Sequence, residues 1–341
     1  MISVSHHNGP AAEWDAFARS QPGFTHFHLF GWKEVMETVF GHECLYLVAR
    51  TAAGAVSGVL PLVRVKSAIF GHYLVSMPFL NYGGPLGDAA SVEQLAAEAV
   101  RLADRQKVKL LELRSRIPLP LPLPVSHRKI TVVLDLPAMG EELFKQIPAK
   151  VRSQVRRPQK EGVTVRIGTD QVSPFFTVFA RHMRDLGTPA LPLLFFETIA
   201  RVFPGDAWFG CAYLNDQPIA CGAGFTWGGE FEMTWASSLS AHNRIAPNML
   251  LYWSFMERAI EQKLQVFNFG RCTPESGTHR FKRQWGSRDE TLHWYQHTRG
   301  NQVASTPSPD DGAFSWGPRI WKRLPLPLAT ALGPRIVQYI P

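Results

Sequence analysis

The sequence predicts an α+β protein made of two similar units in tandem, each a mixed sheet flanked by helices. Its 341 residues correspond to two domains, at roughly 150 residues per domain. Apolar residues make up 45% of the chain, with 22 Phe and 10 Trp, which is a globular composition and excludes disorder as the main state. The order helix, helix, hairpin, helix, strand occurs twice, and it differs from the strict alternation of a doubly wound parallel sheet.

The first unit begins with two helices and continues with a hairpin. Pro10 occupies a favoured first position before a helix over 11–19, and a second helix covers 31–40. The side chains expected to face the sheet are Trp14, Phe17, Trp32 and Val35. Residues 43–50 and 56–65 are predicted to be the two strands of the hairpin.

A helix and a buried strand complete the first unit. Apolar residues recur at helical spacing over 91–106, with Ser91 as the expected N-cap, and 110–114 is a short strand. The second unit is predicted to have helices 174–186 and 195–202, strands 208–214, 219–226 and 230–236, helix 248–262 and strand 266–271.

Equivalent positions of the two units are separated by similar distances along the chain. Val92 precedes Met249 by 157 residues, and Leu110 precedes Phe267 by 157. The offset from Leu45 to Cys211 is 166 residues. Near-constant spacing indicates one supersecondary unit used twice.

The boundary between the units follows a proline-rich stretch. Residues 116–124 alternate proline with apolar residues, so they are extended, as a linker or as an edge segment. A strand over 130–136 and a basic helix over 141–160 come next, and Pro158 should end or bend that helix early. The predicted domains are 1–128, 129–300 and a C-terminal tail, 301–341.

The charge balance and the cysteines limit the function classes. The net charge of +8 favours a phosphorylated or polyanionic partner, although a solubilising surplus explains it as well. The cysteines Cys44, Cys211, Cys221 and Cys272 lie too far apart to encode a disulfide framework or a zinc ribbon, so a reducing compartment is expected. The histidine pairs at 6–7 and 26–28 have no cysteine or carboxylate partners at ligand spacing, so no metal site is predicted.

The expected location is the cytoplasm. The first fifteen residues have neither the basic start nor the apolar stretch of a signal peptide. No window approaches the roughly 20 apolar residues that span a bilayer. The chain is therefore expected to be soluble, or attached at most to the inner surface of the plasma membrane.

The C-terminal tail mixes apolar and basic residues. No acidic residue follows Asp311, while Trp316, Ile320 and Leu328 alternate with Arg319 and other basic residues. This composition suits the surface of an anionic membrane. The alternative is a tail that docks on the protein's own core, and its four prolines argue against one continuous amphipathic helix.

Two motifs resemble a known family. Residues 150–163 resemble the signature of Fem-type peptidyltransferases, in which a basic helix runs into a strand. Residues 267–271 followed by 277–286 resemble the FemAB-related subfamily that accompanies bacterial PEP-CTERM/exosortase and exopolysaccharide loci. The similarity spans roughly residues 10 to 300 and implies a tandem duplicated GNAT-like (acyl-CoA N-acyltransferase) fold, with mostly antiparallel mixed sheets.

The resemblance implies an acyltransferase. Fem-type enzymes transfer an amino acid from aminoacyl-tRNA to a muropeptide precursor, and other GNAT relatives use acyl-CoA. The implied donor is therefore acyl-CoA or aminoacyl-tRNA, used as a substrate with no tightly bound cofactor, and the implied acceptor is a cell-envelope or exopolysaccharide precursor. The glycine-rich pyrophosphate loop of CoA-dependent GNAT enzymes is not evident, since 241–248 contain no glycine.

Candidate anion-binding residues fall into three groups. Arg271, Arg280, Lys282 and Arg283 occur close together among glycines that let backbone N–H groups approach a phosphate. Arg152 and Arg156 belong to a basic stripe on one helix face, which is equally compatible with an ordinary solvated helix. Asn248 lies at a helix start, where free N–H groups favour an anion.

The candidate proton acceptors are Glu232 and His279. Glu232 lies between aromatic residues on a strand, where a carboxylate with a raised pKa can accept a proton from an amine. His279 lies in the loop of glycines and arginines. Structural roles explain both residues equally well, and a reaction without a protein base remains an alternative.

The candidate acceptor site lies in the first unit. Asn81 and Tyr82, next to Gly83 and Gly84, combine an amide, a phenol and flexible backbone that suit a sugar or a peptide. A tight turn explains the glycines alone. The alternative functions are a non-catalytic protein on the same fold that binds nucleic acid or anionic lipid, and an N-acetyltransferase for an amino sugar.

Overall fold

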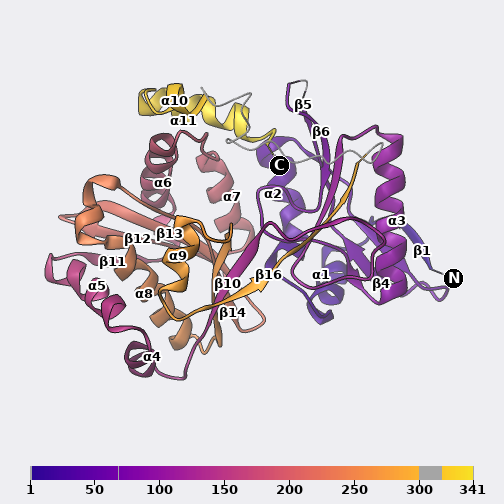
Figure 1. The fold of residues 1–341 in the computed structure, drawn as a ribbon. Coiled ribbons are helices and arrows are strands. Elements are labelled where there is room, and N and C mark those ends of the chain that lie inside the picture. Colours follow the sequence, from indigo (N-terminus) through magenta and orange to yellow (C-terminus); the bar gives the residue numbers. More distant parts are fainter. Residues whose placement is uncertain (1, 68, 299–316, 341) are drawn as a thin grey trace. The chain divides into compact units, whose positions relative to one another are not determined.

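The chain folds into two compact units, each with its own core (Figure 1). The computed structural model describes residues 2–67, 69–298 and 317–340. Among these, the first unit comprises 2–128, 291–298 and 338–340, and the second comprises 129–290 and 317–337. The predicted second domain extended to residue 300, whereas residues 291–298 lie in the first unit because they contribute a strand to its sheet.

The first unit contains two sheets flanked by helices. Its helical elements are α1 (Ala11–Ser20), η1 (His26–His28), α2 (Gly31–Phe40) and α3 (Ala89–Arg105). The sheet β1-β3-β4-β7 consists of Ser3–His6, Leu47–Arg50, Val56–Leu60 and Leu86–Gly87. The sheet β2-β5-β6-β8-β17-β9 consists of Glu43–Cys44, Val63–Ser67, Gly71–Val75, Leu110–Ser115, His293–His297 and Val125–Ser126.

The predicted hairpin of the first unit is wrong in detail. Each of its two strands is divided, so that β2 and β5 pair in one sheet while β3 and β4 pair in the other. Pro61 lies at the division of the second strand, and it has no N–H to donate to a ladder. Leu45 N–H donates to Leu62 O (2.7 Å) at the crossing between the sheets.

Two predicted helix starts are also corrected. Helix α3 is capped by Asp88, whose carboxylate accepts a hydrogen bond from Ser91 N–H (2.7 Å), so Ser91 lies inside the helix. Pro10 has an extended conformation and precedes the first helical residue, Ala11. Trp14, Trp32 and Val35 are buried as expected, while Phe17 is half-buried.

The proline-rich stretch is an edge segment rather than a linker. Its prolines are exposed, while Leu119, Leu121 and Leu123 pack against the core of the first unit. The Tyr295 hydroxyl donates to Leu119 O (2.9 Å) and accepts from Leu119 N–H (2.7 Å). Exposed prolines at a sheet edge leave few N–H groups on which another strand could pair.

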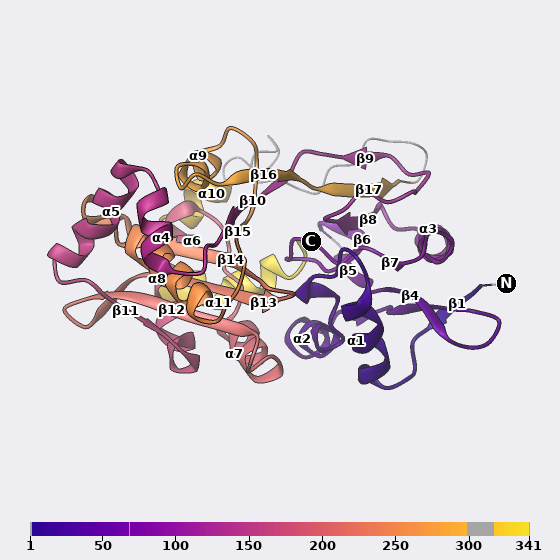
Figure 2. The ribbon, with the colours of Figure 1, turned by 90° about the horizontal axis from the view of Figure 1, so that it is seen from below.

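The second unit is one sheet with helices on both faces (Figure 2). In sheet order its strands are β11 (Thr164–Ile167), β12 (Ala207–Leu214), β13 (Gln217–Trp227), β14 (Glu230–Ser238), β15 (Val266–Cys272), β10 (Ile130–Asp135) and β16 (Arg288–Thr291). Its helical elements are α4 (Gly140–Gln146), α5 (Ala149–Lys160), η2 (Thr169–Gln171), α6 (Val172–Leu186), α7 (Leu193–Val202), η3 (Ser240–Ile245), α8 (Pro247–Glu261), α9 (Gly277–Arg283), α10 (Gly317–Trp321) and α11 (Leu326–Val337). Helices α4, α5 and α8 lie on one side of the sheet and α6 and α7 on the other.

The predicted basic helix over 141–160 is two helices, α4 and α5. The break is at Ile147 and Pro148, because a residue that precedes proline is disfavoured in the helical region. Pro158 does not end α5 as predicted, since the helix continues to Lys160.

The described part of the tail docks on the second unit. Helix α11 packs on α6 and buries Ala329 and Gly333. Arg184 donates to Leu324 O (3.0 Å). Trp316, which belongs to the predicted membrane-binding composition, lies outside the described residues. Within the described ranges, no helix has the length and apolar character needed to span a bilayer.

Both units contain a pair of parallel neighbouring strands at the same relative position. In the first unit β6 pairs with β8 from Tyr73↔Leu110 to Val75↔Glu112. In the second unit β14 pairs with β15 from Glu230↔Val266 to Glu232↔Asn268. The two sets are offset by 157 residues on one strand and 156 on the other, which confirms the duplication and the mixed, mostly antiparallel sheets.

Candidate active site

The parallel strands of the second unit separate after Glu232 and Asn268. These two residues form the last register pair of β14 and β15. Beyond that pair β14 continues along β13, and β15 continues along β10. The two strand ends therefore diverge from one point, at which Glu232 and Asn268 face each other.

A bulge in each strand produces this divergence. Strand β14 carries one extra residue, Thr234, between its pairs with Ala223 and Gly224 of β13. Strand β15 carries one extra residue opposite β10, at Phe269 and Gly270, where Gly270 has a φ of 72°. Bulges bend a strand away from its ladder, so two of them immediately after the last pair turn the strands apart.

Asn268 holds two carboxylates at the point of divergence. Its Nδ2 donates to Glu230 Oε1 (2.8 Å) and to Glu232 Oε2 (3.2 Å). Its Oδ1 accepts from Thr131 Oγ1 (2.6 Å) and from Gly270 N–H (2.8 Å), which fixes the orientation of the amide. Glu232 is fully buried and also accepts from Thr234 Oγ1 (3.3 Å). The predicted proton acceptor Glu232 thus belongs to a buried, oriented pair of carboxylates.

Lys282 supports the bulge of β15 from inside the unit. Its ammonium donates to Gly270 O (2.6 Å) and Arg271 O (3.0 Å), and the side chain is buried. Burial lowers the pKa of Lys282 to about 8, although the negative charges of Glu232 and of an ionised Cys272 act in the opposite direction. The structure therefore places the Lys282 ammonium on backbone carbonyls, away from the solvent side on which a phosphate ligand was predicted.

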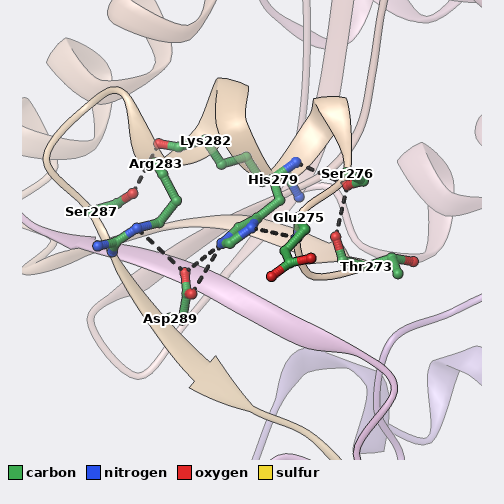
Figure 3. Close-up of polar contacts among 8 residues, drawn as sticks. All are labelled: Thr273, Glu275, Ser276, His279, Lys282, Arg283, Ser287 and Asp289. Atoms are coloured by element: carbon green, nitrogen blue, oxygen red, sulfur yellow. Dashed lines mark hydrogen bonds and ion pairs between the residues drawn. The ribbon is translucent and has the colours of Figure 1, made fainter.

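His279 ties the loop before α9 to β16 (Figure 3). Its Nδ1 accepts from Glu275 N–H (2.9 Å), so Nε2 carries the proton that is shared with Asp289 Oδ2 (3.0 Å). Arg283 Nε lies 3.7 Å from the same carboxylate. Both ring nitrogens of His279 are therefore engaged, which is the arrangement of a structural histidine.

The predicted anion-binding arginines do not form one cluster. Arg280 and Arg283 are exposed on α9, where Arg280 donates to Glu275 O (3.0 Å), and Arg271 is half-buried on β15. Lys282 points to the opposite side of α9, into the core. The four residues, which are close in sequence, therefore lie on β15 and on two opposite faces of α9.

The basic stripe of α5 lines two surface grooves. Arg152 donates to Ile147 O (2.6 Å), and the Arg156 guanidinium lies 5.0 Å from the centre of the Phe144 ring. Both arginines line a groove of about 820 Å³ between α4, α5 and α8. A neighbouring groove of about 390 Å³ adds Arg157 and Lys160.

The start of α8 lies beside this stripe. Arg157 donates to Arg244 O (3.0 Å) in η3, the element that precedes α8. Ala246 caps the helix with a φ of 55°, and Asn248 is half-buried in the first turn. The loop that leads into α8, just before Asn248, therefore contacts the Arg157 guanidinium, and this loop contains no glycine.

The structure buries the predicted acceptor loop of the first unit. Asn81 is 5% exposed and Tyr82 is fully buried, where it packs against the Phe27 ring (5.8 Å between centroids). The predicted acceptor residues Asn81 and Tyr82 therefore lie inside the first unit.

The same loop occupies the strand divergence of the first unit. Ser76 N–H donates to Glu112 O (2.9 Å), and Gly84 N–H donates to Arg114 O (2.7 Å). The buried Arg114 pairs with Glu112 (2.8 Å) and donates to Leu80 O (2.9 Å). The first unit therefore fills with its own chain the place at which the strands of the second unit separate.

Part of the chain matches a known protein family. Residues 148–283 match the family described as the acetyltransferase (GNAT) domain. The matched segment contains β14, β15 and the Glu232–Asn268 pair. No curated protein matches the chain.

Solved structures share the fold over most of the chain. FemX is similar with a TM-score of 0.65 at 15% identity, over 86% of this chain and 97% of that one. L-PGS from Bacillus licheniformis is similar with a TM-score of 0.57 at 10% identity, over 92% and 98%. A tandem GNAT protein from the clavulanic acid biosynthesis pathway is similar with a TM-score of 0.52 at 14% identity, over 89% and 100%.

The chain has a tandem GNAT fold. At these identities the structural likeness establishes the fold alone. The matched acetyltransferase domain implies an acyltransferase activity, without specifying a donor or an acceptor.

Asn268, Glu230, Thr131 and Asp289 were not predicted as residues of the site. Glu230 had a usable signal, since it lies two residues before Glu232 and therefore on the same face of the strand. Thr131 had none, because it reaches Asn268 from a strand 137 residues away in sequence. Asp289 lies ten residues after His279, and no local pattern indicates that the two pair.

Proposed function

We propose that the tandem GNAT protein transfers an acyl or aminoacyl group to an amine or hydroxyl, with the reaction at the strand divergence of the second unit. The observation that carries this proposal is the buried Glu230–Asn268–Glu232 cluster at that divergence. It lies in the segment that matches an acetyltransferase domain. The first unit fills its own divergence with residues 76–84, which favours the second unit as the site of transfer.

In the proposed reaction Glu232 accepts the proton of the attacking group. The acceptor nitrogen or oxygen forms a bond to the acyl carbon, the bond from that carbon to the donor's sulfur or oxygen breaks, and the released thiol or hydroxyl leaves with a proton. A buried carboxylate that is fixed by Asn268 and Thr234 is well oriented for proton transfer.

We propose acyl-CoA or aminoacyl-tRNA as the donor and a cell-envelope or exopolysaccharide precursor as the acceptor. The Arg157 guanidinium, which donates to Arg244 O just before α8, supports a phosphorylated donor, and it lines a groove along α5 together with Arg156 and Lys160. We further place the reaction in the cytoplasm, at the inner face of the plasma membrane.

Mass spectrometry of the ligands that co-purify with the protein identifies the donor class. We expect CoA thioesters or charged tRNA, and a transfer assay with that donor then measures product formation. Glu232→Gln should lower the turnover about 100-fold, because it removes the proton acceptor and keeps the shape of the side chain. Glu93→Gln, an exposed residue of α3, is the matched control.

The rival function is a non-catalytic protein that binds nucleic acid or anionic lipid. Its supporting observation is the basic groove of α5. Thermal stabilisation by RNA or lipid, together with no transfer from acyl-CoA or charged tRNA, would favour the rival. Activity with acetyl-CoA that survives ribonuclease would instead favour an N-acetyltransferase for an amino sugar.

A further inference from the structure

Four helices of the second unit carry most of the exposed large apolar side chains of the described chain. Eight large apolar side chains of the described chain are exposed, and five of them lie on α6, α7, α10 and α11. They are Leu186, Leu194, Ile320, Leu328 and Leu332, each 41 to 54% exposed. Figure 1 shows α10 and α11 lying across the end of α6. We call these five side chains the apolar face.

Helix α11 has apolar residues on its outer side. It is fixed by Ala329 and Gly333, which are buried, and a Cβ on Gly333 would lie 3.0 Å from Ala190 O. Leu328 and Leu332 are one turn apart on the exposed flank of the helix, next to this buried side, where a surface helix normally carries polar residues. Docking on α6 therefore leaves this leucine pair without a cover among the described elements.

The charges around the apolar face are almost all positive. Arg319, Lys322, Arg323 and Arg335 are exposed, and residues 317–340 contain no Asp or Glu. On α6 and α7 the nearest acidic residues are Asp185, which is paired with Arg184 (2.7 Å), and the exposed Glu197. Leucines surrounded by cations combine the two attractions that hold a protein on an anionic membrane.

We propose that the apolar face docks on the surface of an anionic lipid bilayer, with Leu328 and Leu332 in the interface and Lys322 and Arg323 at the lipid phosphates. A second copy of this chain is a poorer occupant, because a symmetric contact would bring the same cations together. The surface requires no spanning helix, in agreement with the short α10 and α11. This inference does not rest on the transferase assignment.

Co-sedimentation of the full chain with vesicles tests the proposal. We expect binding to phosphatidylcholine vesicles that contain about 30% phosphatidylglycerol, and little binding to pure phosphatidylcholine. The double variant Leu328→Gln and Leu332→Gln should lower the partition coefficient about tenfold, because it removes apolar area from the interface. Lys322→Glu with Arg323→Glu should abolish the preference for anionic vesicles, and salt should weaken the binding of the unmodified chain.

Matched variants on the first unit provide the controls. Ile69→Gln removes another exposed apolar residue, and Lys107→Glu with Lys109→Glu reverses two exposed lysines; both should bind as the unmodified chain does. Circular dichroism checks that each variant is folded. If the double leucine variant does not fold, the variant Lys322→Glu with Arg323→Glu still tests the proposal. Absence of binding to anionic vesicles, or equal binding by all variants, would overturn the proposal. So would a change from dimer to monomer in the leucine variant without vesicles. The assay uses neither donor nor acceptor, so its outcome is independent of the transfer assay.

Discussion

Lys282 binds backbone carbonyls at the bulge of β15 and not a phosphate ligand. A lysine in a loop of glycines and arginines predicts phosphate binding, yet its ammonium is held by the carbonyls of Gly270 and Arg271. A β-bulge leaves carbonyls without ladder partners, and a buried donor satisfies them. The sequence could not distinguish these uses, because the bulge depends on the register between β15 and β10.

The pKa of Lys282 leads to a prediction on pH. Its pKa is about 8 in the folded chain, against 10.5 for an ordinary lysine, so the unfolded chain binds more protons between these values. The stability contributed through Lys282 should therefore rise as the pH increases from about 8 to 10.5. The free energy of unfolding of the unmodified chain should gain about 3 kcal/mol over that of Lys282→Met across this range. Urea unfolding of both proteins at several pH values measures the difference, and a constant difference would contradict the assignment.

His279 is expected to matter for stability rather than for proton transfer. Glu275 N–H and Asp289 occupy its two ring nitrogens, so no lone pair is available to a substrate. His279→Gln should lower the free energy of unfolding by about 1 kcal/mol and leave the pH profile of transfer unchanged. Thermal melting and a pH–rate profile measure the two effects. If His279→Gln removed one limb of the pH–rate profile and left the stability unchanged, His279 would instead be the proton acceptor.

Among the elements, the bulges of β14 and β15 determine the site. Gly224 of β13 lies opposite the bulge of β14, where a Cβ would come within 1.8 Å of Glu232 O. No side chain fits there unless the two strands move apart. Because Glu232 is the last residue of β14 paired to β15, such a movement displaces the carboxylate directly.

Gly224→Ala is accordingly predicted to damage both stability and transfer. The free energy of unfolding should fall by about 2 kcal/mol, since the clash is with backbone that cannot rotate away. Gly205→Ala is the matched control, because its Cβ would meet nothing within 4 Å. Urea denaturation and the transfer assay compare the two variants. If both variants had the same free energy of unfolding, the strands at the bulge would accommodate the added Cβ without loss of stability, and the prediction would be wrong.

The limits of sequence reasoning are clearest in these elements. Periodicity predicted β12, β13 and β14 to within two residues at each end, because these strands are long and bounded by turn residues. It failed on the first hairpin, where Pro61 allows the chain to change sheets and the pattern of apolar residues continues without a gap. It identified Glu232 but not its partners, since hydrogen bonds across a sheet depend on a register that no local pattern encodes.

At the scale of the whole molecule, the two copies of one fold have diverged at the same position. The parallel strands of the first unit end at Glu112, which is neutralised by Arg114 and covered by residues 76–84. Those of the second end at Glu232, which meets an amide and a second carboxylate. The first copy closes this position with its own chain and an ion pair, which suits a structural role. The second copy keeps a buried pair of carboxylates held by an amide, which suits a chemical role.

The units are also connected by the path of the chain, since β17 follows the second unit in sequence but completes the first. It lies between β8 and β9, with five register pairs to β8, and it buries Trp294 and Tyr295. A chain that stops after Glu290 should therefore expose the edge of β8 and lose one of the partners of Glu112, because Gln296 donates to that carboxylate (2.9 Å). We expect such a chain to aggregate, whereas one that stops after Thr298 lacks the same tail but keeps β17 and should stay monodisperse. Size-exclusion chromatography with light scattering compares the two. Monodisperse behaviour of the shorter chain would show that the first unit holds together without the strand that returns to it.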